Sequence, residues 1–456
     1  MALIIKNGTL VTSKDTFQAD IRIENGKIKE IAENIAVKNG DEYLDAVGKY
    51  IFPGAIDPHV HMHLPVFAGY SADDFYTGSK AAIYGGTTTL IDFVTPQKGE
   101  TLPNALEKRK KEAENCLCDY SFHVSPIEWR NRLPDEITEI IRQGCTSFKV
   151  YMAYKQSIGL EDEDLFKVMQ TVAKAGALLT VHAEMGDEIE NLRIEFATSG
   201  KTSPEYHPKS RPPETEALAV KKVLEYAERT GCAVYIVHVS SAKSLEHIAA
   251  AQQKGLKVFA ETCPHYLLLD DSRYAGNFEQ TAPFVLSPPL RKKEDNEGLW
   301  LALQKGIIQS TGTDHCPFTM EMKRKGKDDF RYIPNGAGGV EHRLALLYTY
   351  GVLQNKITIN QLIDITATQP AKIFGMYPQK GEIAEGSDAD IVIWNPEKEQ
   401  IISAKNHHQN CDNNIFEGVH TKGAAEYVLI NGELVLFAGN LIQKRKGQFI
   451  SRTIKH

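Results

Sequence analysis

The chain has 456 residues, of which 42% are hydrophobic and 24% are charged, as in an ordinary globular protein with a substantial core. This length allows two or three average domains, although one barrel domain alone can take over ~250 residues. The formal net charge of −7 gives no general attraction to nucleic acid or to anionic membranes, so we expect neither as a partner.

Cysteine content and the N-terminal residues bear on the cellular compartment. The seven cysteines are odd in number and thinly spread, which does not indicate a disulfide framework. Residues 1–8 lack the charged region and long apolar segment of a signal peptide, and no apolar run is long enough to span a bilayer. We therefore expect a reduced, soluble protein of the cytoplasm.

Residues 1–50 are rich in short β-favouring segments, with turns expected at Asn7-Gly8 and Asn25-Gly26. From about residue 50, apolar strands alternate with amphipathic helices, which indicates β/α units and a parallel sheet. Strands are predicted over 51–57, 87–93, 120–124, 147–152, 178–182, 234–239, 257–261 and 307–313. Helices are predicted between them, for example over 134–143, 162–175, 213–230, 242–254 and 296–305. This pattern predicts an α/β fold with a (β/α)8 TIM-like barrel, and a doubly wound open sheet is the alternative that strand count leaves open.

The segment after the barrel returns to short strands. A helix over 359–374 is followed by β-favouring segments at 381–383, 389–394 and 427–432, the last of which echoes the composition of the N-terminal segments. We therefore predict that both chain ends build one small β-sandwich domain, residues 1–50 plus 378–440, around a catalytic barrel of residues 51–377. Residues 441–456 are polar and basic and are predicted to be a peripheral C-terminal tail.

Histidines at the ends of the predicted barrel strands are candidate functional residues. His59 and His61 are two residues apart on a strand and so point to the same face, and neutral imidazole is a common metal ligand. His182, His238 and Asp314 end three further strands. Each alone is more simply a buried, hydrogen-bonded residue. Because the carboxyl ends of barrel strands meet at one mouth, where barrel enzymes carry their chemistry, the residues together predict a metal site.

Lys149 is the unusual member of this group. It lies in the fourth predicted strand among apolar residues, where burial and nearby metal cations both disfavour a charged ammonium. Reaction with carbon dioxide would convert the amine to an N-carboxylate, an anionic group that can bridge two metals. We therefore hypothesise a binuclear site bridged by carbamylated Lys149 and a hydroxide.

A series of longer motifs runs along nearly the whole chain. They are PGAIDPHVH at 53–61, DDFY at 73–76, GGTT at 85–88, FKVYMAYK at 148–155, VHAE at 181–184, IVHV at 236–239, GTDHCPF at 312–318, IPNG at 333–336 and GSDADIV at 386–392. In this order they resemble the cyclic amidohydrolases of the dihydropyrimidinase and D-hydantoinase group. The resemblance implies a homotetramer with two zinc ions per subunit. The implied ligands are His59, His61 and Asp314 for one ion, His182 and His238 for the other, and carbamylated Lys149 with a hydroxide between them.

The same resemblance implies roles toward a small cyclic imide substrate. The hydroxyl of Tyr154 would contact the substrate carbonyl and stabilise the oxyanion, and the main chains of Ser287 and Asn335 would bind the imide. In the implied reaction the bridging hydroxide attacks the ring carbonyl, and Asp314 passes the proton to the leaving ring nitrogen. The product is an N-carbamoyl amino acid.

Other polar residues near these motifs are given lesser roles. We expect His63 to lie in a loop, and His315 to point away from Asp314 with at best an indirect role. Glu184 could support a ligand histidine or form a surface ion pair. Cys263 and Cys316 are interpreted as packing residues, because no adjacent base is evident in the sequence.

Alternative functions come from relatives of the same group. Non-catalytic neuronal scaffold proteins share the barrel and tetramer but lack metal ligands, whereas this chain has all six ligand positions and Tyr154. A dihydroorotase needs a cationic group near the first histidines, where residues 62–67 are mostly apolar. An allantoinase remains possible, with less motif support.

Dihydropyrimidine and 5-substituted hydantoin substrates share the reacting imide and differ in the ring substituent. The pocket for that substituent is predicted to involve Leu64, Phe67, Met152 and the surroundings of Tyr154. Residues 401–409 and 414–418 look closer to dihydropyrimidinases, which favours pyrimidine catabolism.

Overall fold

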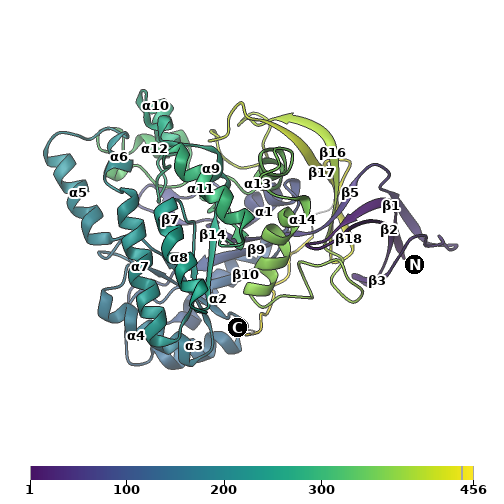
Figure 1. Ribbon diagram of the computed structural model, residues 1–456, viewed down its shortest axis with the longest axis horizontal. Helices are drawn as coiled ribbons and strands as arrows, with labels where there is room; N and C mark the ends of the chain where they lie inside the picture. The colour runs from purple at the N-terminus through teal and green to yellow at the C-terminus, as the bar shows by residue number, and fades with distance from the viewer. Residues whose placement is uncertain (1, 443–444, 455–456) are drawn as a thin grey trace.

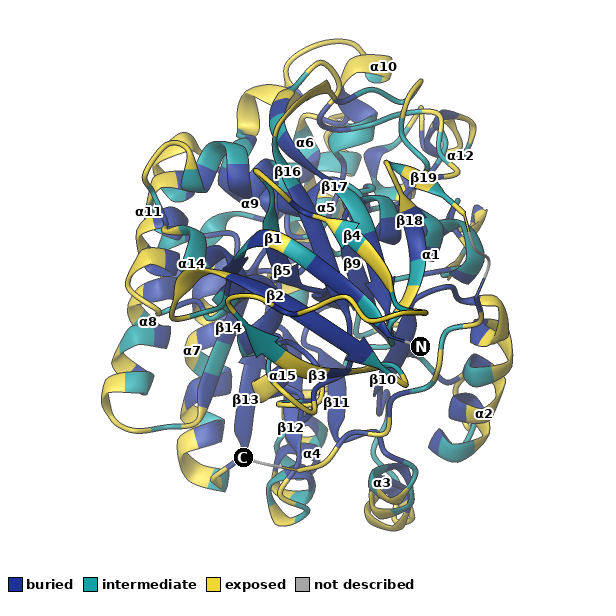
Figure 2. Ribbon diagram, turned by 90° about the vertical axis from the view of Figure 1, so that its right-hand side faces the viewer, coloured by how far each residue is buried: buried dark blue, intermediate teal, exposed yellow. Residues whose placement is uncertain are grey.

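The computed structural model describes residues 2–442 and 445–454. Its larger part is an eight-stranded parallel barrel surrounded by helices, and its smaller part is a mixed sheet at one side of the barrel (Figure 1). The barrel strands are almost entirely buried, whereas parts of the mixed sheet and the outer faces of the surrounding helices are exposed (Figure 2).

The barrel strands follow one another around the sheet in chain order, from β6 to β15. Their bounds are β6 Ala55–Val60, β9 Thr87–Val94, β10 Asp119–Val124, β11 Ser147–Tyr151, β12 Leu178–His182, β13 Ala233–Ile236, β14 Val258–Thr262 and β15 Ser310–Thr311. Every residue of β9 to β12 is buried, because helices cover the outer face and side chains fill the interior. The sequential order confirms the barrel over the open doubly wound sheet.

Two predicted strands are wrong in their extent, and the one predicted over 307–313 is observed only at Ser310–Thr311. The apolar run over 51–57 holds two strands, β5 (Tyr50–Pro53) and β6, and β5 belongs to the mixed sheet. Gly54 lies between them, and a Cβ added there would come 2.2 Å from Oγ1 of Thr88. The chain therefore passes from one sheet to the other at a residue that must be small.

Helices form the outer layer of the barrel and continue after its last strand. Those that follow barrel strands are α1 Phe75–Tyr84, α2 Leu102–Glu112, α3 Leu133–Arg142, α4 Asp162–Lys174, α7 Pro213–Thr230, α8 Ala242–Gln253 and α11 Lys293–Gln304. After β15 come α13 Arg343–Leu347, α14 Ile359–Ile363 and α15 Gln369–Ile373, which alternate with the π-helical turns η5 Tyr348–Val352 and η6 Asp364–Thr368. Further elements are α5 Gly186–Thr198, α6 Tyr206–Lys209, α9 Pro264–Leu268, α10 Phe278–Thr281, α12 Met320–Arg324, η1 Ala113–Asn115, η2 Asp271–Tyr274, η3 Ala282–Phe284, η4 Phe330–Tyr332 and the hairpin β7 Pro65–Val66 with β8 Gly69–Tyr70.

Local sequence explains where several helices begin and end. Helix α7 starts with Pro213, whose missing N–H costs nothing in the first turn, and stops at Gly231 with φ 70°. Helix α1 begins at a capping box, in which the Asp74 carboxylate accepts from the backbone of Thr77 and the Thr77 side chain accepts from the backbone of Asp74.

The barrel closes between β6 and β15 mainly through side chains. An isolated parallel bridge pairs Val60 with His315 just beyond the strand ends. The carboxylate of Asp57 accepts hydrogen bonds from the backbone N–H and the hydroxyl of Thr313, at 3.1 and 2.6 Å. These contacts fix the register of the first barrel strand against the last.

Arg343 crosses the same seam from helix α13. Its guanidinium is fully buried, and Nη1 donates to the carbonyl oxygens of Ile56 in β6 and Thr311 in β15. The charge lies 3.9 Å from Asp57, so the ion pair and the two carbonyls together offset the cost of burying it.

Both chain ends build the smaller part, as predicted. It is one mixed sheet of nine strands, in the order β19-β18-β17-β16-β5-β1-β2-β3, with β4 paired to β1. Their bounds are β1 Leu3–Val11, β2 Thr16–Glu24, β3 Lys27–Ala32, β4 Glu42–Asp45, β5, β16 Ile391–Ile401, β17 His420–Ile430, β18 Glu433–Phe437 and β19 Asn440–Leu441. The Asn25-Gly26 turn joins β2 to β3 as expected, with φ of 51° and 77°. The turn expected at Asn7-Gly8 is instead a bulge inside the continuous strand β1.

The peripheral tail predicted for the C-terminus is not what residues 445–454 form; residues 443–444 and 455–456 of that prediction lie outside the described residues. Arg452 is 2% exposed and donates to the hydroxyls of Ser121 and Ser147, both at 2.8 Å, and to the carbonyl oxygen of Phe122. The segment therefore packs against the start of the barrel strands, at the end of the barrel opposite α10 and α12 (Figure 1).

In the part of the chain that the structure describes, each helix is too short or too polar to cross a lipid bilayer.

Candidate active site

Three side chains from the two ends of the barrel sheet form a ligand-like group. His59 lies at the end of β6, His61 follows it, and Asp314 follows β15. Nε2 of each histidine lies 3.1 Å from Oδ1 of Asp314, and the ligand atoms of the three residues all lie within 4.8 Å of one another. Two imidazole nitrogens and a carboxylate oxygen at this spacing suit one divalent transition-metal ion.

The two ring nitrogens of His59 have different environments. Nδ1 hydrogen-bonds to the buried carboxylate of Glu261, which orients the ring and leaves Nε2 for another ligand. Nε2 is buried and has no hydrogen-bond partner within residues 2–442 and 445–454, although Oδ1 of Asp314 lies 3.1 Å away. A ring nitrogen without a hydrogen bond, facing a carboxylate and a second imidazole, fits a metal ion.

Charges around His59 and Asp314 shift both pKa values. Burial disfavours the charged imidazole, yet Glu261 and Asp314 raise the pKa of His59 to about 9. Burial likewise works against the Asp314 carboxylate, but His59 and His61 hold its pKa well below the usual range. The Asp314 carboxylate is therefore anionic at neutral pH.

His182 and His238 form a second pair of imidazoles. Nδ1 of His182 lies 2.9 Å from Nε2 of His238, and Nε2 of His182 lies 2.7 Å from Oε2 of Glu184. Arg211 donates to the same oxygen of Glu184 at 2.6 Å. Burial would raise the pKa of Glu184, but Arg211 and His182 lower it to about 2, so a fixed negative charge orients the His182 ring. Of the two roles considered for Glu184, the structure shows contact with a candidate ligand.

The two histidine groups lie against each other at the mouth of the barrel. The ring centroids of His59 and His238 are 5.3 Å apart, and those of His182 and His238 are 4.7 Å apart. The sequence argument predicted that these strand ends meet, and the structure brings the four imidazoles and Asp314 together.

Lys149 lies inside β11 and is almost fully buried. Its Nζ is 4.8 Å from the ring centroid of Phe93 and 5.1 Å from that of Tyr151, and no ion pair to it occurs within residues 2–442 and 445–454. Burial lowers its pKa to about 8. Burial therefore favours the neutral amine, which is the form that reacts with carbon dioxide.

Backbone strain also occurs in the same region. His238, Tyr154 and Asp314 are non-glycine residues with φ of 38°, 60° and 50°. Such conformations cost about 1–3 kcal/mol each and occur where surrounding structure or function requires them. Sequence reasoning did not foresee this strain, because local composition gives no sign of it.

Tyr154 lies in the loop between β11 and α4, over the second histidine pair. Its ring centroid is 5.4 Å from that of His182 and 5.3 Å from Cζ of Arg211. Three backbone N–H groups, those of residues 157–159, donate to its carbonyl oxygen and hold the strained loop in place.

The segments of Ser287 and Asn335 lie side by side. The N–H of Gly336 donates to the carbonyl oxygen of Val285 at 3.0 Å, and the N–H of Cys316 donates to that of Ala337 at 2.9 Å. The second contact links the Asn335 segment to the chain just after Asp314. The segment of Asn335 is therefore hydrogen-bonded both to the segment of Ser287 and to the chain that follows Asp314.

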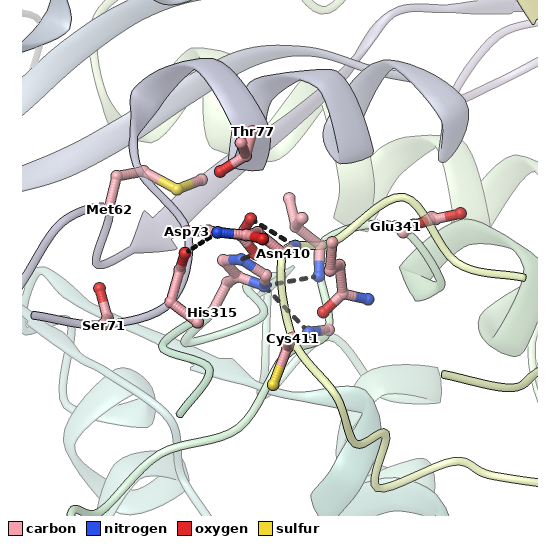
Figure 3. A network of polar contacts seen from close by, with 12 residues as sticks. Met62, Ser71, Asp73, Thr77, His315, Glu341, Asn410 and Cys411 are labelled. Carbon is pink, nitrogen blue, oxygen red and sulfur yellow. Dashed lines mark hydrogen bonds and ion pairs between the residues drawn. The ribbon is translucent and has the colours of Figure 1, made fainter. Parts of the chain in front are cut away.

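The His315 side chain lies in a polar network with Asp73 and Asn410 (Figure 3). Nε2 lies 3.0 Å from Oδ2 of Asp73, and Nδ1 accepts from the N–H groups of Gly339 and Val340 at 3.1 and 3.3 Å. Oδ1 of Asp73 accepts from the N–H of Asn410 at 2.8 Å. The network joins the loops after β6 and β15 to the segment between β16 and β17.

Sequence reasoning missed Glu261, which contacts His59 and accepts from the N–H of His238 at 3.2 Å. The signal was available, because Glu261 ends the seventh predicted strand, where a buried carboxylate should be noticed. The two cysteines interpreted as packing residues, Cys263 and Cys316, are free and buried, and burial raises the pKa of both thiols.

Comparison with known proteins agrees with this geometry. Residues 50–435 match the model of the amidohydrolase family. The chain is 43% identical to a D-hydantoinase of Geobacillus stearothermophilus, over 99% of this chain and 97% of that one. It is 38% identical to a dihydropyrimidinase of Dictyostelium discoideum, over 99% and 90% of the two chains. A solved D-hydantoinase from a Bacillus species superposes with a TM-score of 0.98 at 42% identity, covering 100% of both chains.

The mouth of the parallel barrel thus carries two histidines and an aspartate that could hold a metal ion. The chain belongs to the amidohydrolase family, in its group of D-hydantoinases and dihydropyrimidinases.

Proposed function

We propose that this enzyme opens the ring of 5,6-dihydropyrimidines, of 5-substituted hydantoins or of both, by hydrolysing the cyclic amide bond. The observation that supports this most is the meeting of His59, His61 and Asp314 within 4.8 Å at the barrel mouth, in a chain whose relatives are hydantoinases and dihydropyrimidinases. The product would be an N-carbamoyl amino acid.

We propose the metal arrangement that the resemblance implied. His59, His61 and Asp314 would hold one zinc ion, His182 and His238 the other, and carbamylated Lys149 would bridge them. The hydrogen bond between His182 and His238 occupies the atoms that the second ion would take, so metal binding would replace it. Two zinc ions would supply Lewis acidity and an acidified water near neutral pH.

Three parts of the chain act on the substrate in this proposal. Asp314 accepts the proton of the attacking water and passes it to the leaving ring nitrogen. The hydroxyl of Tyr154 donates a hydrogen bond to the developing oxyanion, a contribution of typically ~3 kcal/mol in such sites. The main chains of Ser287 and Asn335 hold the imide in place.

The ring substituent would face an apolar rim. Phe67, in the hairpin of β7 and β8, is 65% exposed, and its ring centroid is 6.4 Å from that of Tyr332. Met152 is buried at the end of β11. Leu64 precedes the hairpin. These residues could accept either the small edge of a dihydropyrimidine or a larger hydantoin substituent.

The alternatives predict different behaviour. A scaffold function would not need the six ligand positions together with Tyr154, and an allantoinase would open neither imide ring efficiently. We propose a homotetramer, as the resemblance implies.

Ring-opening rates of zinc-loaded protein supplied with bicarbonate test the proposal, on dihydrouracil and on a 5-aryl hydantoin. We expect at least one ring to be opened efficiently, and the preferred ring identifies the substrate class. If metal-replete protein opens neither ring, the proposed function is wrong, and the allantoinase and scaffold functions become the leading alternatives.

A further inference from the structure

A buried lysine outside the metal group connects the two segments proposed to bind substrate. Lys323, in helix α12, is 1% exposed. Its Nζ donates to the carbonyl oxygens of Val285, Pro334 and Gly336, at 2.9, 2.7 and 2.9 Å. All three N–H donors of the ammonium thus have carbonyl acceptors.

The charge of Lys323 has no carboxylate partner within residues 2–442 and 445–454. The titratable groups that face it are the thiols of Cys316 and Cys411, and burial raises the pKa of both. Burial lowers the pKa of Lys323 to about 7, which reflects the cost of placing an ammonium there. The three carbonyl acceptors offset part of that cost, so the ammonium is held by the backbone of these two segments rather than by a counter-charge.

The three carbonyls belong to peptide units that flank the proposed substrate contacts. In a trans peptide the C=O and N–H point in opposite directions. Because the carbonyl oxygen of Pro334 accepts a hydrogen bond from Lys323, the N–H of Asn335 in the same peptide unit points away from Lys323. The N–H of Gly336 donates to the carbonyl of Val285 at 3.0 Å, so the carbonyl of Asn335 is aimed away from Val285.

Val285 is therefore the point where both segments meet. Val285 lies two residues before Ser287, and its carbonyl oxygen accepts hydrogen bonds from Nζ of Lys323 and from the N–H of Gly336. On the other side of this turn, Nε2 of the buried His207 donates to the carbonyl of Leu286 at 2.7 Å, which fixes the peptide that carries the N–H of Ser287. Lys323 is the only side chain among the described residues that hydrogen-bonds to both segments.

We propose that Lys323 is a positioning residue that sets the spacing and direction of the main-chain groups of Ser287 and Asn335 toward the substrate imide. The inference rests on the proposed function, because it takes these groups as the substrate contacts. Lys323 touches neither substrate nor metal in this proposal and acts through the three carbonyls.

The test compares Lys323→Met with the wild-type holoenzyme, using whichever of the two rings is opened faster. Misplaced substrate contacts weaken binding in the ground state and transition state alike, so KM should rise roughly tenfold or more while kcat changes by less than about threefold. Zinc content should stay at the wild-type level. Arg324→Met is the matched control, because Arg324 is the next residue of α12 and pairs with Glu279 on the surface.

Lys323→Gln is the second variant, since its amide keeps two N–H donors and should give an intermediate KM. An unchanged KM in Lys323→Met, or loss of zinc in step with loss of activity, would overturn the inference. Failure of both variants to fold would also overturn it, because Lys323 would then be a folding determinant. If the wild-type protein itself opens neither ring, the proposed function fails first and the inference with it.

Discussion

Replacing Glu261 with glutamine removes one negative charge beside the ligand group without changing its shape. Oε1 of Glu261 contacts Nδ1 of His59 and accepts from the N–H of His238, and Oε2 accepts from the hydroxyl of Tyr235 at 2.8 Å. Glutamine retains one carbonyl oxygen, so the contact with the ring can persist as a neutral hydrogen bond. What is lost is the charge assistance that orients His59 and increases the electron density on Nε2.

The expected loss of metal affinity follows from the difference in free energy between a hydrogen bond to a charged group and a neutral hydrogen bond. A bond to a charged group contributes about 1.5–3 kcal/mol and a neutral one about 0.5–1.5 kcal/mol, a difference of about 1–2 kcal/mol. We therefore expect metal binding at this site to weaken roughly 5- to 30-fold.

Metal affinity is measured by chelator competition on metal-free protein, run at about pH 9, where protons compete less with the metal for imidazole nitrogens. Glu341→Gln is the matched control, because Glu341 makes a similar contact, 2.7 Å to Nδ1 of His408, away from the ligands. Equal metal affinity in the wild-type and Glu261→Gln proteins, with both folded, would refute the idea that Glu261 orients a ligand.

Two further changes test other parts of the structure. Lys149→Ala should lose metal and activity together, since the bridging group is removed. A short carboxylic acid added to this variant should restore part of both. Full zinc occupancy and activity of the variant without added acid would disprove the bridge. Arg452→Met should lower the free energy of unfolding by about 2–4 kcal/mol, because three acceptors near the start of the barrel strands lose a charged donor. Thermal unfolding measures the effect of Arg452→Met, and Lys446→Met, at an exposed position, is the control. If the thermal unfolding midpoint of Arg452→Met equals that of the wild type, the C-terminal segment adds no stability.

The barrel was predictable because its strands are buried on both faces and read as apolar runs between amphipathic helices. The same property hid the boundary between β5 and β6, since both are apolar and one glycine separates them. The four histidines and Asp314 were predictable as a group because each lies at the end of a predicted barrel strand. Composition could place these residues at one mouth but could not give the hydrogen bond between His182 and His238.

Buried cations were the main failure of sequence reasoning. The sequence pattern placed Arg452 in a polar, basic tail and indicated no role for Lys323, yet both are buried and donate to backbone carbonyls or hydroxyls. Carbonyl acceptors occur at every residue, so no pattern of side chains reveals where three of them converge. For the same reason, the polar composition of the C-terminal segment does not indicate that Arg452 is buried.

The seam between the first and last barrel strands constrains how the site comes into being during synthesis. Asp57 and Thr313, which join across it, are 256 residues apart in the chain. The histidines of the first barrel strand therefore emerge long before the aspartate that completes their ligand group. A chain released before β15 would have no three-residue site, and a metal ion that binds only the closed barrel would favour the finished fold over partly folded chains.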